Sequence, residues 1–299
     1  MLDSNDHPGF PGIAVILIIA TGVVLAGMDA TAKYLALELP VILVLWGRYF
    51  FHTAITFAAY SLNTRSFAFL RARRPGLQMI RAFALFGATF TMYLAIMRMP
   101  LGDAAAIQFL APVLVTALSG LLLGERVGPR RWFAVVCGFI GVLLVARPGS
   151  GVLGWNALLP LATAVLLAVY MMMTRIIRNI DDRAATTFYS TAVGALLLSL
   201  IAVIEWQSLS GFQWLLMVTM GGAGALGHFM LVRAFHSAEA SMLAPFTYSQ
   251  VIAAIGWGYL VFGDVPSLWT VSGAAVVIAS GIYVWYRERL LIRRDQTSR

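Results

Sequence analysis

The sequence predicts an all-α integral membrane protein with ten transmembrane helices, arranged as two inverted five-helix repeats around a central cavity. Three observations support this fold class. Hydrophobic residues make up 60% of the 299 residues and charged residues only 11%, whereas an ordinary soluble domain is about 25% charged. The apolar residues fall into runs long enough to cross a bilayer. In addition, two parts of the chain resemble one another.

Ten apolar runs, separated by turn residues and charges, mark the expected spans. A helix needs about 20 mainly apolar residues to cross a hydrocarbon core of roughly 30 Å, so a chain of this length holds ten helices with short loops and no soluble domain. The acidic start, MLDSNDHPGFPG, lacks the basic region of a signal peptide, and we expect the first run to be retained. In order, the runs cover residues 13–36, 41–61, 77–98, 103–123, 131–147, 153–174, 184–205, 212–235, 239–262 and 268–287.

The distribution of Lys and Arg predicts the orientation. The net charge is +8, but the arginines are spread between apolar runs rather than gathered in one patch, which argues against a nucleic-acid partner. Loops rich in Lys and Arg face the cytoplasm, and placing the N-terminus there leaves only Arg98 and Arg147 in the outer connections. We therefore expect a multi-pass protein of the inner (cytoplasmic) membrane with both termini, and a basic C-terminal tail, in the cytoplasm.

The chain repeats itself. YLAIMRMPLGDAAA (93–106) aligns with FMLVRAFHSAEASM (229–242) at an offset of 136, and LLLGERV aligns with LVFGDVP at an offset of 139, which pairs Glu125 with Asp264. Residues 1–149 and 150–299 are therefore predicted to form two five-helix units. An odd number of spans in each unit makes the second unit enter the membrane from the opposite side. Inverted repeats of this kind allow one midplane site to face either side in turn.

These segments resemble a known family. PLGDAAAIQFLAPVLVTALSGLLLGERV with GFIGVLLVARPG is similar to the EamA-type repeat of the drug/metabolite transporter superfamily, as is APFTYSQVIAAIGWGYLVFGDVPSLWTVSGAAVVIASGIYV. The resemblance covers nearly the whole chain. It implies a ten-helix transporter in which both halves enclose a central cavity and the fifth and tenth helices are peripheral. Members move amino acids, other metabolites, nucleotide sugars or drugs, and the YddG-like amino-acid exporters are one bacterial branch.

Ionisable residues within the spans are the first candidates for a substrate site, because charges in a membrane usually face a bundle interior or an aqueous cavity. Asp29 and Lys33 are four residues apart on one helix face and can pair. The pair lines the cavity in one interpretation, and Lys33 extends to the outer surface in the other. Arg48 lies about 10 Å inside its span. Its guanidinium fits a substrate carboxylate, or it pairs with a carboxylate such as Asp29 and holds two helices together.

Aromatic and polar residues complete the predicted site. His228 lies among the glycines of MGGAGALGHFM, which leave room for a ligand or for close helix packing. Pro245 introduces a break whose freed carbonyl groups can bind substrate, together with neighbouring polar side chains. Trp257 lines the cavity or joins an aromatic belt at the membrane surface. The predicted substrate-binding residues are Asp29, Lys33, Trp46, Arg48, His228, Tyr248, Gln250 and Trp257.

Other ionisable residues have simpler interpretations. Arg81 is expected to mark the cytoplasmic end of the third span, and His52 to be a satisfied core residue. Carboxylates at helix starts complement the helix dipole, which accounts for Asp103 and Glu239. Glu125 and Asp264 follow glycines at helix ends and are predicted to be turn residues.

No catalytic or metal-binding motif is present, since HExxH, GxSxG and paired acidic metal motifs do not occur. The single cysteine, Cys137, cannot form an intrachain disulfide or a Cys-based metal site. We expect no cofactor and no enzymatic activity. The predicted function is export of small metabolites, with amino acids first, by alternating access. The alternatives are broad drug or nucleotide-type efflux and, from a different class, an intramembrane enzyme. The expected partners are a small-molecule substrate and the lipid bilayer, and homodimer formation is left open.

Overall fold

The fold is entirely helical in the described part of the chain, as the sequence predicts. The computed structural model describes residues 12–64, 71–123, 129–147, 154–177, 180–237 and 243–297. The first half contains α1 (Gly12–Leu35), α2 (Val41–Thr64), α3 (Pro75–Ile96), α4 (Leu101–Gln108), α5 (Ala111–Leu123) and α6 (Pro129–Ala146). The second half contains the 3-10 helices η2 (Gly154–Ala157) and η3 (Ala244–Tyr248) and the α-helices α7 (Leu158–Ile177), α8 (Arg183–Ala202), α9 (Gly211–Ser237), α11 (Ser249–Phe262) and α12 (Leu268–Thr297).

These helices correspond to the ten predicted spans when α4 with α5, and η3 with α11, are each counted as one interrupted span. Six helices in the described ranges are long and apolar enough to cross a membrane by length and composition. Three shorter apolar helices add to them, covering Leu101–Val115, Trp132–Ala146 and Leu268–Tyr283. The fourth span differs from its prediction, because the structure interrupts it at Phe109 and Leu110.

Prolines, glycines and one aspartate set several helix ends. Pro75 and Pro129 are the first residues of α3 and α6, where the missing N–H of proline costs no hydrogen bond. Gly263 ends α11 with a φ of 70°, a left-handed conformation that glycine adopts without a steric penalty. Asp182 caps α8 by accepting a hydrogen bond from the backbone N–H of Ala184. These ends are local in the sequence, which explains why the predicted spans lie close to the observed ones.

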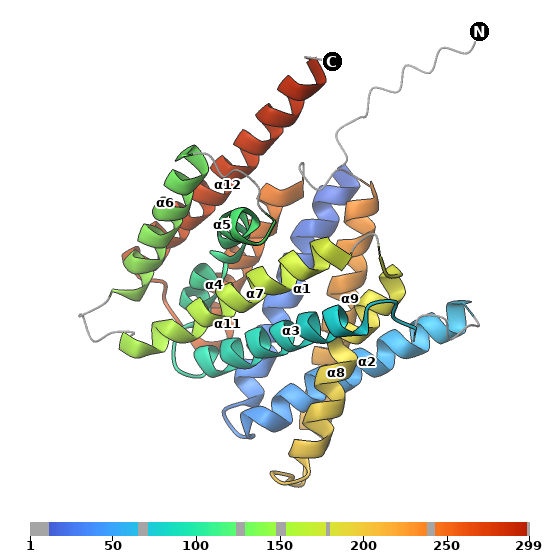
Figure 1. The fold of residues 1–299 in the computed structure, drawn as a ribbon. Coiled ribbons are helices and arrows are strands. Elements are labelled where there is room, and N and C mark those ends of the chain that lie inside the picture. The colour runs from blue at the N-terminus through green and yellow to red at the C-terminus, as the bar shows by residue number, and fades with distance from the viewer. Residues whose placement is uncertain are drawn as a thin grey trace.

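Helices of the two halves pack against one another. Helix α1 lies against α9 and α11, α2 against α8 and α9, α3 against α7, and α6 against α12. Figure 1 shows α6 and α12 side by side at one edge of the bundle. The fifth and tenth spans are thus peripheral, as the family resemblance implies.

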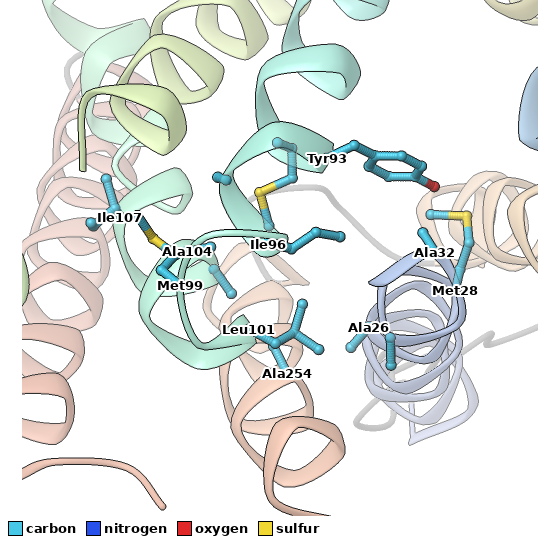
Figure 2. Close-up of a cluster of buried hydrophobic side chains, with 14 of the residues drawn as sticks. Ala26, Met28, Ala32, Tyr93, Ile96, Met99, Leu101, Ala104, Ile107 and Ala254 are labelled. Atoms are coloured by element: carbon cyan, nitrogen blue, oxygen red, sulfur yellow. The ribbon is translucent and has the colours of Figure 1, made fainter. Parts of the chain in front are cut away.

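A hydrophobic core fills the space where α1, α3, α4 and α11 meet. Figure 2 shows Leu101 of α4 lying against Ala254 of α11, with Ala26 of α1 nearby. All three side chains are fully or almost fully buried. Small residues such as these alanines let helix backbones approach closely in a membrane. The core lies toward the end of the bundle at which α1 ends and α4 begins.

Candidate functional site

A cavity of about 300 Å³ lies between the two halves of the protein. Helices α1, α2, α3 and the α4–α5 break line it from the first half, and α7, α9, η3 and α11 line it from the second. Pockets for small molecules are typically about 300–1,000 Å³ and mostly apolar, with a few polar groups that orient the ligand. The polar residues lining this cavity are Thr21, Asp29, Arg48, Thr89, Gln108, Thr163, Tyr170, His228, Thr247 and Gln250.

Four of the eight predicted site residues line this cavity. They are Asp29 on α1, Arg48 on α2, His228 on α9 and Gln250 on α11. The structure therefore brings together residues from both halves that are far apart in the sequence.

Asp29 and Arg48 face the cavity as separate charges. Asp29 is only 7% exposed, yet it forms no hydrogen bond with any residue that the structure describes, and no ion pair within 4.0 Å joins it to Arg48. The guanidinium carbon of Arg48 lies 5.3 Å from the ring centroid of Tyr93 and 5.9 Å from that of Tyr49, within the range of a cation–π attraction. Charges inside a membrane protein usually face a partner or an aqueous cavity, and both of these side chains line the cavity.

The predicted pairing of Lys33 with Asp29 is wrong. The ammonium nitrogen of Lys33 lies 3.0 Å from Oδ2 of Asp264 and donates a second hydrogen bond to the carbonyl oxygen of Met99 at 3.2 Å. Lys33 lies one helical turn beyond Asp29 and does not line the cavity, and its long side chain reaches the segment after α11. Asp264, predicted to be only a turn residue, is therefore also an ion-pair partner. Sequence separation hid this pair, since 231 positions divide the two residues.

Trp46 lies in an aromatic cluster rather than in the cavity lining. Its indole N–H donates to the hydroxyl of Ser199 at 3.0 Å. Its ring centroid is 5.4 Å from that of Trp206 and 6.1 Å from that of Trp214. A buried indole needs an acceptor for its N–H, and Ser199 of α8 supplies one. The structure thus places Trp46 in the contact between α2, α8 and α9.

Tyr248 and Trp257 also lie outside the lining. The ring centroid of Tyr248 is 5.6 Å from that of Phe109, and the phenol lies so close to Gly281 that any side chain there would overlap it. The indole N–H of Trp257 donates to the carbonyl oxygen of Val23 at 3.1 Å. These residues pack η3 against α12 and α11 against α1.

Two interrupted spans meet at the cavity. Gln108 ends α4 at one break and Thr247 lies in η3 at the other, and both side chains line the cavity. Interrupted segments at corresponding positions of two repeats are a mark of transporter binding sites. The break at Pro245 is predicted from the sequence, whereas the first break, which the lining residue Pro112 follows, is not.

Arg81 is an internal residue that also supports the cavity wall. It is 2% exposed, and each of its five N–H groups has an acceptor, so its charge is well solvated by the protein. Tyr170, a hydrogen-bond partner of Arg81, lines the cavity. Arg81 was expected only to mark the cytoplasmic end of the third span, so this contact was not predicted. The acceptors are the side chains of Gln78, Tyr170, Thr174 and Ser190 and the carbonyl oxygen of Thr186, at 2.6–3.2 Å.

Of the remaining predicted ionisable residues, His52 lies in the core and Asp103 at the start of a helix. His52 is 3% exposed, and its ring centroid lies 5.2 Å from that of His228. Asp103 lies in the first turn of α4, as predicted, and it also accepts a hydrogen bond from the hydroxyl of Thr270 on α12 at 2.5 Å. Glu125 and Glu239 lie outside the described residues.

Comparison with known proteins gives the family. Residues 12–147 and 154–286 each match the EamA-like transporter family. A riboflavin transporter of Vibrio cholerae is 29% identical over 231 residues, which cover 76% of this chain and 77% of that protein. An S-adenosylmethionine uptake transporter of Rickettsia conorii is 25% identical over 90% of this chain and 91% of its own. The pseudopaline exporter CntI of Pseudomonas aeruginosa is 26% identical, with 90% and 94% covered.

A solved crystal structure has the same fold, with a TM-score of 0.64 at 21% identity over 93% of this chain and 98% of the other. The relatives carry the names of riboflavin, S-adenosylmethionine and pseudopaline transporters, so they support neither the YddG-like branch nor the amino-acid substrate that the sequence predicted. The family match, in contrast, extends over both halves and includes the helices that line the cavity. The chain therefore belongs to the EamA-like transporter family of the drug/metabolite transporter superfamily, and it is a multi-pass membrane transporter of small metabolites rather than an enzyme.

Proposed function

We propose that this protein carries a small amphoteric metabolite, with an acidic and a basic group on a flat or apolar body, through the central cavity by alternating access. The observation that supports this substrate class is the arrangement of Asp29 and Arg48. Both line the cavity and neither is paired with the other. Among the described lining residues, Asp29 is the only Asp or Glu and Arg48 the only Lys or Arg. Their opposite charges therefore cancel.

The two charges suit complementary groups on one ligand. A guanidinium binds a carboxylate through two parallel hydrogen bonds, and the carboxylate of Asp29 accepts hydrogen bonds from an ammonium or a ring N–H. A phosphorylated substrate would meet one cation together with a repelling carboxylate, which disfavours nucleotide-type efflux. Met28, Met92 and Phe109 also line the cavity. Methionine side chains adapt to varied shapes and make favourable contacts with aromatic rings.

S-adenosylmethionine has this chemistry, since it joins a carboxylate and an ammonium to a flat heterocycle, and a similar compound is our first candidate substrate. Amino acids carry the same pair of charges on a smaller body, and they remain in the proposal as the smallest members of the class. Riboflavin has no carboxylate and offers only neutral polar groups to Arg48. The proposal includes the inner membrane as location, with both termini in the cytoplasm, because of the distribution of arginines.

Transport assays in reconstituted vesicles test the proposal. Vesicles are loaded with S-adenosylmethionine, riboflavin, a mixture of amino acids and a sugar phosphate, and mass spectrometry follows both efflux and uptake. We expect protein-dependent movement of unchanged amphoteric solutes. Absence of such movement for the whole panel would overturn the proposal, and a new chemical product would instead support an intramembrane enzyme.

Two variants connect this flux to the cavity. Arg48→Met should weaken the apparent affinity for a carboxylate-bearing substrate by about 10- to 100-fold, which is the usual range for a charged hydrogen bond. Trp46→Phe is the matched control, because Trp46 lies outside the lining, and it should leave the KM unchanged. Equal effects of the two substitutions on KM would contradict the assignment of the site.

A further inference from the structure

The central cavity stops short of the end of the bundle at which α1 ends. On α1 its lining runs from Ile18 to Asp29 and stops there, although the helix continues to Leu35. The cavity thus does not extend along the last six residues of α1. Beyond Asp29, α1 is packed in the hydrophobic core through the buried residues Ala30, Ala32 and Leu35, of which Figure 2 shows Ala32.

An ion pair joins the two halves at this end of the bundle. Lys33 belongs to the first half and Asp264 to the second, and the distance between Nζ and Oδ2 is 3.0 Å. The ammonium also lies 4.7 Å from the ring centroid of Phe262 and donates to the carbonyl oxygen of Met99. The two side chains are 12% and 25% exposed. This partial burial screens the attraction less than it would be screened at an open surface.

The backbone holds Asp264 in place. Gly263 ends α11 in the left-handed conformation, with a φ of 70°, and the backbone N–H of Asp264 then donates to the carbonyl oxygen of Gly258 at 3.1 Å. This turn directs the chain back toward α1. Because its backbone is fixed in this way, Asp264 loses only side-chain freedom when its carboxylate pairs with Lys33.

A second, smaller hollow of about 170 Å³ reaches Asp264. Its wall includes Arg98, Asp103, Arg147 and Thr270, and Lys33 does not line it. The main cavity does not reach Lys33 either. The ion pair therefore borders the smaller hollow through Asp264, and neither of its residues lines the main cavity.

We propose that the Lys33–Asp264 ion pair is the gate that closes the central cavity toward the face at which α1 ends. This inference depends on the proposed alternating access. The two halves must separate at this face for the cavity to open there, and the ion pair must then break. Its contribution stabilises the closed arrangement alone, so removal of either charge shifts the population toward the arrangement open to this face.

Thiol labelling tests the gate without a transported substrate. The native Cys137 is replaced by Ser, and a single cysteine is placed in the cavity by Ala88→Cys, because Ala88 lines the cavity from α3. A small membrane-impermeant thiosulfonate reagent is applied to each membrane face in turn. We expect Lys33→Met to raise the labelling rate from the face at which α1 ends by about three- to tenfold, the shift expected for one partly buried pair. It should also lower the rate from the opposite face.

A charge exchange provides the decisive comparison. The double variant Lys33→Asp with Asp264→Lys restores opposite charges, and it should return the labelling rate toward that of the parent. Lys33→Arg should label like the parent, because it keeps the ion pair. Unchanged labelling in Lys33→Met would overturn the proposal, as would fast labelling in a folded double variant. Monodisperse elution in detergent identifies the folded variants.

Glu38→Gln is the matched control. Glu38 follows α1 and accepts a hydrogen bond from Gln213 of the second half at 2.8 Å, in an exposed position. It should leave the labelling unchanged, and an equal increase would contradict a specific role for Lys33 and Asp264. The labelling rate is measured without a transported substrate. If transport is observed but the labelling rate of Lys33→Met is unchanged, only the gate proposal is refuted. Absence of flux with altered labelling refutes the proposed substrate class alone.

Discussion

The rings of Phe109 and Tyr248 lie 5.6 Å apart at an angle of 50°. Phe109 directly follows α4, and Tyr248 ends η3, so each ring stands at the break of an interrupted span. The two positions differ by 139, the same offset that pairs Glu125 with Asp264 in the sequence. The contact therefore brings the breaks of the two interrupted spans together beside the cavity, where Phe109 is a lining residue.

Tyr248→Phe should not destabilise the protein. The hydroxyl of Tyr248 is buried without a hydrogen-bond partner among the described residues, and removal of an unsatisfied polar group is neutral or stabilising by up to about 1 kcal/mol. Tyr49→Phe is the matched control, because the hydroxyl of Tyr49 donates a hydrogen bond to Thr89 at 3.0 Å. Loss of this hydrogen bond should lower the free energy of unfolding by about 1 kcal/mol. Thermal unfolding in detergent measures the stability of both variants. Equal losses of stability would contradict the conclusion that the Tyr248 hydroxyl has no hydrogen-bond partner.

Asp29 should carry the pH dependence of transport if the flux is coupled to protons. It is the only carboxylate among the described lining residues, and an intramembrane carboxylate facing a cavity is the usual kind of proton site. In Asp29→Asn the flux should no longer vary with pH, because the amide does not titrate. Flux measured between pH 5.5 and 8 in matched vesicles checks this. A parent-like pH profile in the variant would exclude Asp29 from the role.

Arg81→Lys should destabilise the protein by about 2–4 kcal/mol. Lysine keeps the charge but has three donors where arginine has five, so some of the acceptors around Arg81 would remain unsatisfied at a cost of about 1–3 kcal/mol each. Arg98→Lys is the control, because Arg98 is exposed and donates to the carbonyl oxygen of Leu94. Its effect should stay below about 0.5 kcal/mol. Thermal unfolding of the two variants in one detergent provides the comparison, and a stable Arg81→Lys protein would refute the network's importance.

Gly273→Val should separate the peripheral helices. A Cβ at Gly273 would lie 2.6 Å from the carbonyl oxygen of Gly141, so α12 cannot stay in contact with α6 without a backbone shift. Overpacking of this kind costs about 1–3 kcal/mol or more. Gly256→Ala is the control, because no atom lies within 4 Å of a Cβ placed there. Melting temperatures distinguish the two variants. The folded Gly273→Val protein should keep its KM, since no described residue of α12 lines the cavity.

The sequence alone determined the number, order and approximate ends of the spans. Backbone groups in lipid must satisfy their hydrogen bonds internally, so an apolar run of sufficient length has to be helical. The sequence also indicated Asp29 and Arg48 as cavity residues, because a charge inside a span is tolerated only where it faces the interior of the bundle. The repeat, read from 93–106 and 229–242, indicated that both halves contribute to one site.

Only the tertiary structure decided which neutral residues reach the cavity and which charges pair. Side chains that face lipid and side chains that face neighbouring helices are both apolar in a membrane protein, so the sequence pattern does not reveal which face of a helix is buried. Trp46 and Trp257 look equally suitable for a site, yet helix packing directs their N–H groups to Ser199 and Val23. Lys33 pairs with Asp264 rather than Asp29 because the packing of α1 against α11 brings together segments that the sequence keeps far apart.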